Sequence, residues 1–261
     1  MRKCSGYFKK RQEVVLQLLQ KTPGSYTAST VHQLRVEIKK LNAFFHLLNF
    51  CAKKFRRSKT YKPFKIIFVH AGKLRELDVE MAALKKYSGG KMPVTYSKQL
   101  KQLRLREKEQ FVAAITKKRV AQISNLLQRV LPFLAEINKK KLNRYMQQQE
   151  EYLLHFTGKG PLLAAQVHEL RKRLKKMEYN RKGLLPDMED ESPLHKDTFT
   201  GLLGKWHDIQ VMVQHLAKAT RAAGLSTTEK KHLQTIKKKW VADGRLLLKQ
   251  INNVVVSAGK Q

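Results

Sequence analysis

Acidic residues are scarce in this sequence. Its 261 residues include 20 Asp and Glu against 54 Lys and Arg, which gives a formal net charge of +34. A compact chain with such an excess repels itself unless an anion relieves the charge. The composition therefore predicts a polyanionic partner, which could be nucleic acid, an acidic membrane surface or a phosphate polymer.

Cysteine and long apolar segments are also rare. Cys4 and Cys51 are the only cysteines, which excludes a Cys-x-x-Cys metal or redox motif and a disulfide framework. This usage favours a reducing compartment, and we expect the protein in the cytoplasm. Nowhere do about 18 apolar residues follow one another without a charge, and no apolar segment follows Met1 to Arg11. We therefore expect neither a membrane span nor a signal peptide.

Apolar residues are nevertheless abundant enough for a core, at 42% of the chain. Leu, Lys, Gln and Ala, all good helix formers, dominate the segments between turn-forming clusters, and two-residue alternation is nearly absent. We predict an all-α fold of about eight helices with no sheet. Two of the longest predicted helices cover 28–58 and 95–131. In the first, apolar residues recur at steps of three and four, as in a helix packed within a bundle.

The chain contains an internal repeat. Residues 31–41 align with 167–177, and residues 72–79 align with 204–211. The two pairs occur in the same order and are separated by nearly the same distance, 136 and 132 residues. We predict a single domain over 1–261 that consists of two pseudo-symmetric antiparallel four-helix bundles, 1–132 and 133–261.

The first repeated segment carries a basic stripe. The stripe follows the rhythm of the apolar residues but is displaced by one position, or about 100° around the helix, so it flanks the core. Cations from the two halves could then converge on one groove, where arginine forks and lysine point charges suit repeated phosphates. The stripe residues are His32, Arg35, Lys39, Asn42 and His46 in the first copy and His168, Arg171, Lys175, Glu178 and Lys182 in the second.

Two alternatives for these stripes stay open. Each stripe could simply be a solvated helix face, which is the common arrangement for lysine and arginine. The histidines, His32 and His168, could bond to a phosphate or only hold the neighbouring cations in place.

The second repeated segment carries a glycine inside a predicted helix, Gly72 in one copy and Gly204 in the other. Because each glycine costs about 1 kcal/mol relative to alanine there, we predict close helix packing at both positions. We expect the neighbouring carboxylates, Glu76 and Asp208, to form ordinary intramolecular ion pairs.

Signals for catalysis or metal binding are weak. The chain has no Gly-x-x-x-x-Gly-Lys-Ser/Thr loop, no Gly-x-Ser-x-Gly, no His-Glu-x-x-His and no inward Glu-x-x-His set of the di-iron kind. We predict no catalytic residue, no metal site and no cofactor, and we expect the protein not to be an enzyme.

These motifs together resemble the CHAD family, whose name stands for conserved histidine α-helical domain. The resemblance rests on Val31-His32-x-x-Arg35-x-x-x-Lys39-Lys40, its second copy beginning at Val167, and the two glycine-containing segments, and it covers essentially the whole chain. It implies a helical fold of two pseudo-symmetric four-helix bundles that binds inorganic polyphosphate through basic residues. Some members of the family are associated with polyphosphate granules.

The resemblance also implies a set of binding residues. Asn42, Glu178 and His207 depart from the family pattern and are not carried over. The residues carried over by position are His32, Arg35, Lys39, Lys40, Lys65, Arg75, His168, Arg171, Lys175 and Lys176.

We therefore predict a non-enzymatic protein that binds inorganic polyphosphate, with polyphosphate granules as one location and weak nucleic-acid binding as a second property. Few motif positions are aromatic, so the stacking platforms expected of single-strand binders are not evident. The alternative is a general nucleic-acid-binding or granule-scaffolding protein whose charge is diffuse.

Overall fold

All regular secondary structure in the described part of the chain is helical, so the predicted all-α class is confirmed. The arrangement as two pseudo-symmetric four-helix bundles stays a prediction. The computed structural model describes residues 2–157, 160–185, 192–221 and 224–259, and no strand occurs among them. Residue 1 and residues 260–261, at the ends of the predicted domain, lie outside the described residues. Within the described ranges, no helix combines the length and the apolar character that a membrane span requires.

Ten α-helices and three short 3-10 helices make up the described chain. The α-helices are α1 (Arg2–Leu19), α2 (Ala28–Cys51), α3 (Arg57–Tyr61), α4 (Phe64–Tyr87), α5 (Val94–Ala113), α6 (Lys117–Gln128), α7 (Lys139–Leu154), α8 (Ala164–Leu184), α9 (Asp197–Ala219) and α10 (Thr227–Ala258). The 3-10 helices are η1 (Pro23–Ser25), η2 (Leu131–Glu136) and η3 (Pro193–His195).

Two predicted helices were too long. The segment 95–131 breaks between α5 and α6, where the Thr116 hydroxyl accepts a hydrogen bond from the Arg119 backbone N–H and caps the new helix. The segment 28–58 ends at Cys51, because the next residue, Ala52, has an extended backbone. Hydrophobic periodicity continues across both breaks, and for this reason it did not reveal them.

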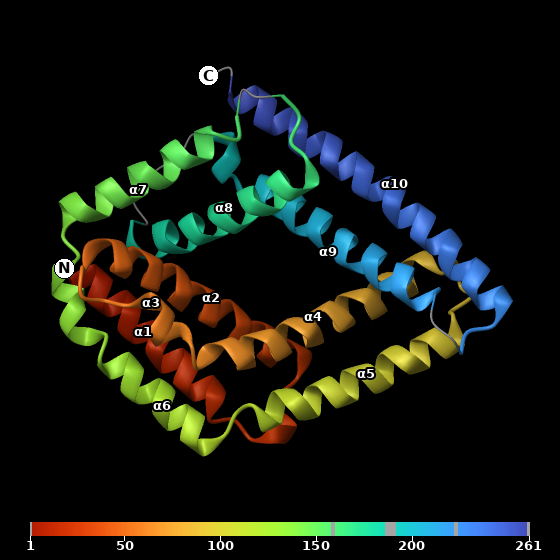
Figure 1. The fold of residues 1–261 in the computed structure, drawn as a ribbon, viewed down its shortest axis with the longest axis horizontal. Coiled ribbons are helices and arrows are strands. Elements are labelled where there is room, and N and C mark those ends of the chain that lie inside the picture. Colours follow the sequence, from red (N-terminus) through yellow and green to blue (C-terminus); the bar gives the residue numbers. More distant parts are fainter. Residues whose placement is uncertain (1, 158–159, 186–191, 222–223, 260–261) are drawn as a thin grey trace.

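The repeated segments come together at the centre of the fold. Helices α2 and α8, which carry the histidine motifs, pack against each other, and so do α4 and α9, which carry the glycine motifs. Figure 1 shows α1 beside α2, while α5 and α10 run along the outer sides of α4 and α9. Four helices from distant parts of the sequence therefore meet in one place.

The buried side chains form two clusters. The larger one surrounds α2, whose Phe44 and Phe45 are fully buried, and extends to α1, α4, α7, α8 and α10. The smaller one lies between α4, α5, α9 and α10, around the fully buried Trp240. Both clusters draw on both halves of the chain, so the packing does not divide into one core for each half. The division into 1–132 and 133–261 stays a prediction.

A buried carboxylate links three helices of the smaller cluster. Glu80 of α4 has no exposed surface. It accepts a hydrogen bond from the Tyr96 hydroxyl of α5 at 2.6 Å, and its other oxygen lies 2.7 Å from Nδ1 of His215 on α9. The bond to Glu80 raises the pKa of His215. A buried charge is tolerated here because both of its oxygens have partners.

Helix α1 approaches α8 closely at a glycine. A β-carbon at Gly183 would overlap the ring of Tyr7. The Tyr7 hydroxyl donates a hydrogen bond to the Tyr179 carbonyl at 3.3 Å. The absence of a side chain at Gly183 is thus what lets the tyrosine lie flat against α8.

We predict that Gly183→Ala lowers the free energy of unfolding by about 1–3 kcal/mol, since an added methyl in a filled space forces side chains apart. Urea denaturation measures this change. The control is Gly201→Ala on α9, where a β-carbon meets nothing within 4 Å, and we expect it to gain up to about 1 kcal/mol from helix propensity. An unchanged or raised stability for Gly183→Ala would contradict the packing described.

Candidate anion-binding site

A small cavity lies where α2, α4, α8 and α9 meet, and we call it the central pocket. Its volume is about 170 Å³. Four cationic side chains from three of these helices face two carboxylates there, so the pocket carries excess positive charge. Its polar lining residues are His32, Arg35, Lys39, Arg75, Glu76, Arg171, His207 and Asp208.

Arg35 is held in the pocket by contacts from α4. Its Nη1 donates to the Phe68 carbonyl at 3.1 Å, and its guanidinium carbon lies 4.3 Å from the centroid of the Phe68 ring, a cation–π contact. A β-carbon at Gly72 would lie 2.6 Å from the same Nη1. The predicted close packing at Gly72 is therefore present. At Gly204 the prediction was wrong, because a β-carbon there meets nothing within 4 Å.

The other three cations of the central pocket have no partner of their own. Within the described part of the chain, Lys39, Arg75 and Arg171 form no hydrogen bond or ion pair, and Nε of Arg171 is buried without an acceptor. A buried donor left unsatisfied costs about 1–3 kcal/mol. This arrangement is typical of a site that receives its acceptors from a ligand.

Lys39 shows the electrostatic consequence most clearly. Burial lowers its pKa to about 8, and the neighbouring charges of Arg35 and Arg171 act in the same direction. Asp208 opposes the shift but does not cancel it. Near neutral pH the free site thus holds a lysine whose charge is only weakly stabilised, and a bound anion would favour the charged form.

Helix α9 contributes a carboxylate, Asp208, and a neutral imidazole, His207, to the central pocket. Burial raises the pKa of Asp208, although Arg171 and Arg75 lower it, and burial with Arg171 lowers the pKa of His207 to about 4. The ion pairs predicted for Glu76 and Asp208 are absent: in the described chain neither carboxylate lies within 4 Å of a cationic nitrogen. The sequence analysis did not predict that Glu76, His207 and Asp208 line the pocket. The repeat could have indicated it, because it aligns Arg75-Glu76 with His207-Asp208.

The two motif histidines take different positions. His32 lines the central pocket, and burial together with Arg75 lowers its pKa, so it is neutral near pH 7. The His168 ring packs against the His207 ring, with 5.1 Å between their centroids. His32 thus faces the pocket, whereas His168 supports a residue that does.

A second cavity, which we call the lateral pocket, adjoins the first. It measures about 310 Å³ and shares Lys39 and Arg171 with the central pocket. Lys175 lines it and pairs with Glu178 at 2.7 Å. Lys176 lines it as well, and burial and Arg173 lower the pKa of Lys176. The two pockets together bring a strip of cations from α2 and α8 within reach of one elongated ligand.

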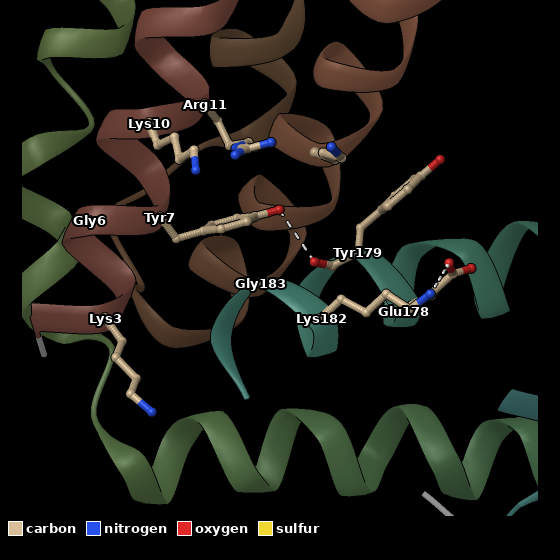
Figure 2. Close-up of a pocket in the computed structure, with 10 residues that line it drawn as sticks. Lys3, Gly6, Tyr7, Lys10, Arg11, Glu178, Tyr179, Lys182 and Gly183 are labelled. Carbon is tan, nitrogen blue, oxygen red and sulfur yellow. Dashed lines mark hydrogen bonds and ion pairs between the residues drawn. The ribbon is translucent and has the colours of Figure 1, made fainter. Parts of the chain in front are cut away.

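Lys40 lines neither the central nor the lateral pocket. It lines a separate, larger cavity of about 680 Å³ between α1 and α8 (Figure 2). There Glu37 lies 2.7 Å from Lys40 and 3.0 Å from Arg11, and Glu178 lies 3.2 Å from Lys182. Lys40, Arg11 and Lys182 are thus already paired with carboxylates of the chain, and for this reason we do not assign the anion site to this cavity, although Lys3 and Lys10 line it as well.

Lys65 also lies apart from the candidate site. It is exposed in the first turn of α4 and lines none of the three pockets described above. The central pocket therefore combines five of the predicted residues, the lateral pocket adds two more, and His168 lines neither pocket but contacts His207 of the central one. The five are His32, Arg35, Lys39, Arg75 and Arg171.

The sequence also matches a known protein family. Residues 12–217 match the family model of the CHAD domain. The chain belongs to the CHAD family. No curated protein matches the sequence.

Two solved structures are similar in fold. The CHAD domain from the plant Ricinus communis is 15% identical, with a TM-score of 0.73 over 97% of this chain and 87% of that one. PptA from Streptomyces chartreusis is 14% identical, with a TM-score of 0.73 over 100% of this chain and 99% of that one. At such low identity these likenesses establish the shared helical fold.

We predict unequal effects for alanine at the two repeated glycines. Gly204→Ala should raise the free energy of unfolding by about 0.5–1 kcal/mol, the usual gain inside a helix. Gly72→Ala should gain less or nothing, because Arg35 must leave the Phe68 carbonyl. Thermal unfolding of the two variants beside the parent protein measures the difference. Equal gains would show that Arg35 does not depend on Gly72.

We also predict that Lys39→Met stabilises the protein near pH 7 by about 1 kcal/mol. The folded-state pKa of Lys39, about 8, lies below its ordinary value of 10.5. The charged form therefore costs stability below pH 8, and this cost disappears as the pH rises from 8 to 10.5. Urea denaturation at pH 7 and pH 10 should show the gain shrinking.

The matched control is Lys40→Met, which removes a lysine already paired with Glu37 and should not stabilise the protein. A gain that is equal for the two variants, or that does not change with pH, would contradict the electrostatic account of Lys39.

Proposed function

We propose that this CHAD protein binds inorganic polyphosphate and neither cuts nor extends it. The observation that carries the proposal is the central pocket, where Lys39, Arg75 and Arg171 converge from three helices without partners of their own. Charge-assisted bonds to phosphate oxygens would satisfy these donors, and an arginine fork can hold two oxygens at once.

The shape of the site favours a chain of phosphates. The central and lateral pockets share Lys39 and Arg171, so consecutive phosphates of one chain could contact both pockets. None of the described residues that line the central pocket is Phe, Tyr or Trp, and the lateral pocket has one such residue, Tyr179. A nucleic acid would thus find positive charge but few aromatic rings on which to stack its bases.

We further propose that the two halves of the chain act as a pseudo-symmetric pair around this site, as two four-helix repeats. In support, α2 packs on α8 and α4 packs on α9, so each repeated segment lies next to its copy. Each half then supplies one histidine-bearing helix and one glycine-bearing helix to a shared groove. Binding of this kind would also place the protein at polyphosphate granules.

A set of substitutions tests whether the charge acts locally. Replacing Arg35, Lys39, Arg171 and Lys175 with alanine should weaken binding of labelled polyphosphate by about a hundredfold, because several charge-assisted contacts are lost together. Fluorescence anisotropy measures the Kd.

The matched control removes two arginines and two lysines that are exposed and line none of the three pockets, Arg106, Arg144, Lys59 and Lys118. This variant carries the same net charge and should lose no more than a few-fold in affinity. Similar losses in the two variants would favour the diffuse, general polyanion binder. Since Arg35 also packs on Phe68, the pair Lys39→Met and Arg171→Gln serves as a second site variant.

Competition separates polyphosphate from nucleic acid. Single-stranded RNA and duplex DNA, supplied at equal phosphate concentration, should displace labelled polyphosphate much less well than unlabelled polyphosphate does. Salt dependence would not separate them, because counterion release affects both.

In the same samples, gel analysis after incubation with a divalent metal should show an unchanged polyphosphate length. Shortened or lengthened chains would overturn the non-enzymatic assignment.

A further inference from the structure

Lys39 differs from the lysines around it. It lines both pockets and forms no hydrogen bond or ion pair in the described chain. Lys40 and Lys175, by contrast, each lie 2.7 Å from a carboxylate oxygen. Lys39 is thus a partly buried primary amine that opens into a cationic cavity and is not held by an acid.

Cationic groups from several helices surround the amine of Lys39. Its own helix contributes Arg35, and three other helices pack around it. In the central pocket the charged and titratable groups from these helices are Arg75 and Glu76 of α4, Arg171 of α8, and His207 and Asp208 of α9. In the lateral pocket α8 adds Glu169, Lys172, Arg173, Lys175, Lys176 and Tyr179.

We propose that Lys39 accepts the acyl group of small acyl phosphates, which the central pocket binds by their phosphate at Arg35 and Arg171. The cavity, at about 170 Å³, is smaller than those that enclose drug-sized ligands. It suits one phosphate with a short acyl chain. The site would therefore be acylated without a second enzyme.

The transfer is balanced and needs no further reactant. The uncharged Nζ of Lys39 attacks the acyl carbonyl carbon, a C–N bond forms, and the C–O bond to the phosphate breaks. The electron pair of that bond leaves with the phosphate, which takes the proton lost from nitrogen and departs as hydrogen phosphate. Arg171 and Arg35 would stabilise the charge that develops on the leaving group.

The state of the amine supports this chemistry. Only an uncharged amine is a nucleophile, and burial with the surrounding cations brings the pKa of Lys39 to about 8. At pH 8 about half of such an amine is uncharged, roughly a hundred times the fraction of an ordinary lysine. If amines follow the trend seen for thiols, the weaker nucleophilicity of a less basic group removes about tenfold of this advantage.

Acylation would also regulate the site. An acylated Lys39 carries no charge and fills part of the pocket, so polyphosphate affinity should fall. This consequence rests on the proposed function, whereas the acyl transfer itself requires only the cationic pocket and the amine.

The test uses the full chain and acetyl phosphate at pH 8, with site occupancy followed by mass spectrometry over time. We expect Lys39 to be acetylated about tenfold faster than Lys40, its neighbour in sequence. If Lys39 reacts no faster than Lys40, the proposal is wrong.

A variant separates phosphate binding from simple amine reactivity. Arg171→Gln should slow acetylation of Lys39 by acetyl phosphate several-fold more than acetylation by acetic anhydride, which has no phosphate to bind. The control Arg144→Gln makes the same charge change at an exposed position of α7 and should leave both rates unchanged. Equal slowing with the two reagents would show that the phosphate is not bound at Arg171 and would overturn the proposal.

Acetylation in the presence of polyphosphate tests the acyl-transfer site and the polyphosphate site separately. Excess polyphosphate should protect Lys39 and leave Lys40 unprotected. Rapid acetylation of Lys39 without protection would keep the acyl-transfer site and refute the polyphosphate site. Tight polyphosphate binding without preferential acetylation of Lys39 would keep the polyphosphate site and refute the acyl-transfer site.

Discussion

The packing of α2 against α8 is the constraint on which the rest of the site depends. Buried leucines of the two helices, Leu34 and Leu170 among them, are fully enclosed, and the Asn180 side chain donates to the Ala43 carbonyl at 3.0 Å across the contact. This packing brings Arg171 next to Arg35 and Lys39 although like charges repel. Apolar burial, which does not depend on charge, has to outweigh that repulsion in the free protein.

A bound anion would relieve the repulsion between these cations. A ligand that binds the folded state more tightly than the unfolded one stabilises the fold by linkage. The acidic groups nearby do not serve this purpose. Glu37 pairs with Lys40 and Arg11 beside the α1–α8 cavity, and Glu178 pairs with Lys182 there and with Lys175 of the lateral pocket. Asp208 and Glu76, by contrast, stay beyond ion-pair distance of the central cations. The distribution of the few carboxylates therefore decides which cations have an acidic partner within the chain.

The sequence sufficed for the helical class, for the repeat and for five residues of the central pocket. Periodicity predicted the helices, the repeated basic stripe predicted four of the five residues, and the resemblance to the CHAD family predicted Arg75. The break at Thr116 depends on a single capping hydroxyl, which periodicity does not detect. Lys40 follows Lys39 directly, yet one residue of helix turns it about 100° to another cavity. Partners such as Phe68 for Arg35, 33 residues away, become visible only in three dimensions.

The two halves of the site are related but unequal, and the inequality has a physical reason. Where the first half places Arg75, the second places His207, whose pKa near 4 keeps it neutral at pH 7. A fifth full charge beside Arg171 and Lys39 would add repulsion without adding apolar burial. A neutral ring can still bond to an anion while it packs on His168. The repeat therefore supplies a common scaffold, and the substitution at one position limits the charge that this scaffold must hold.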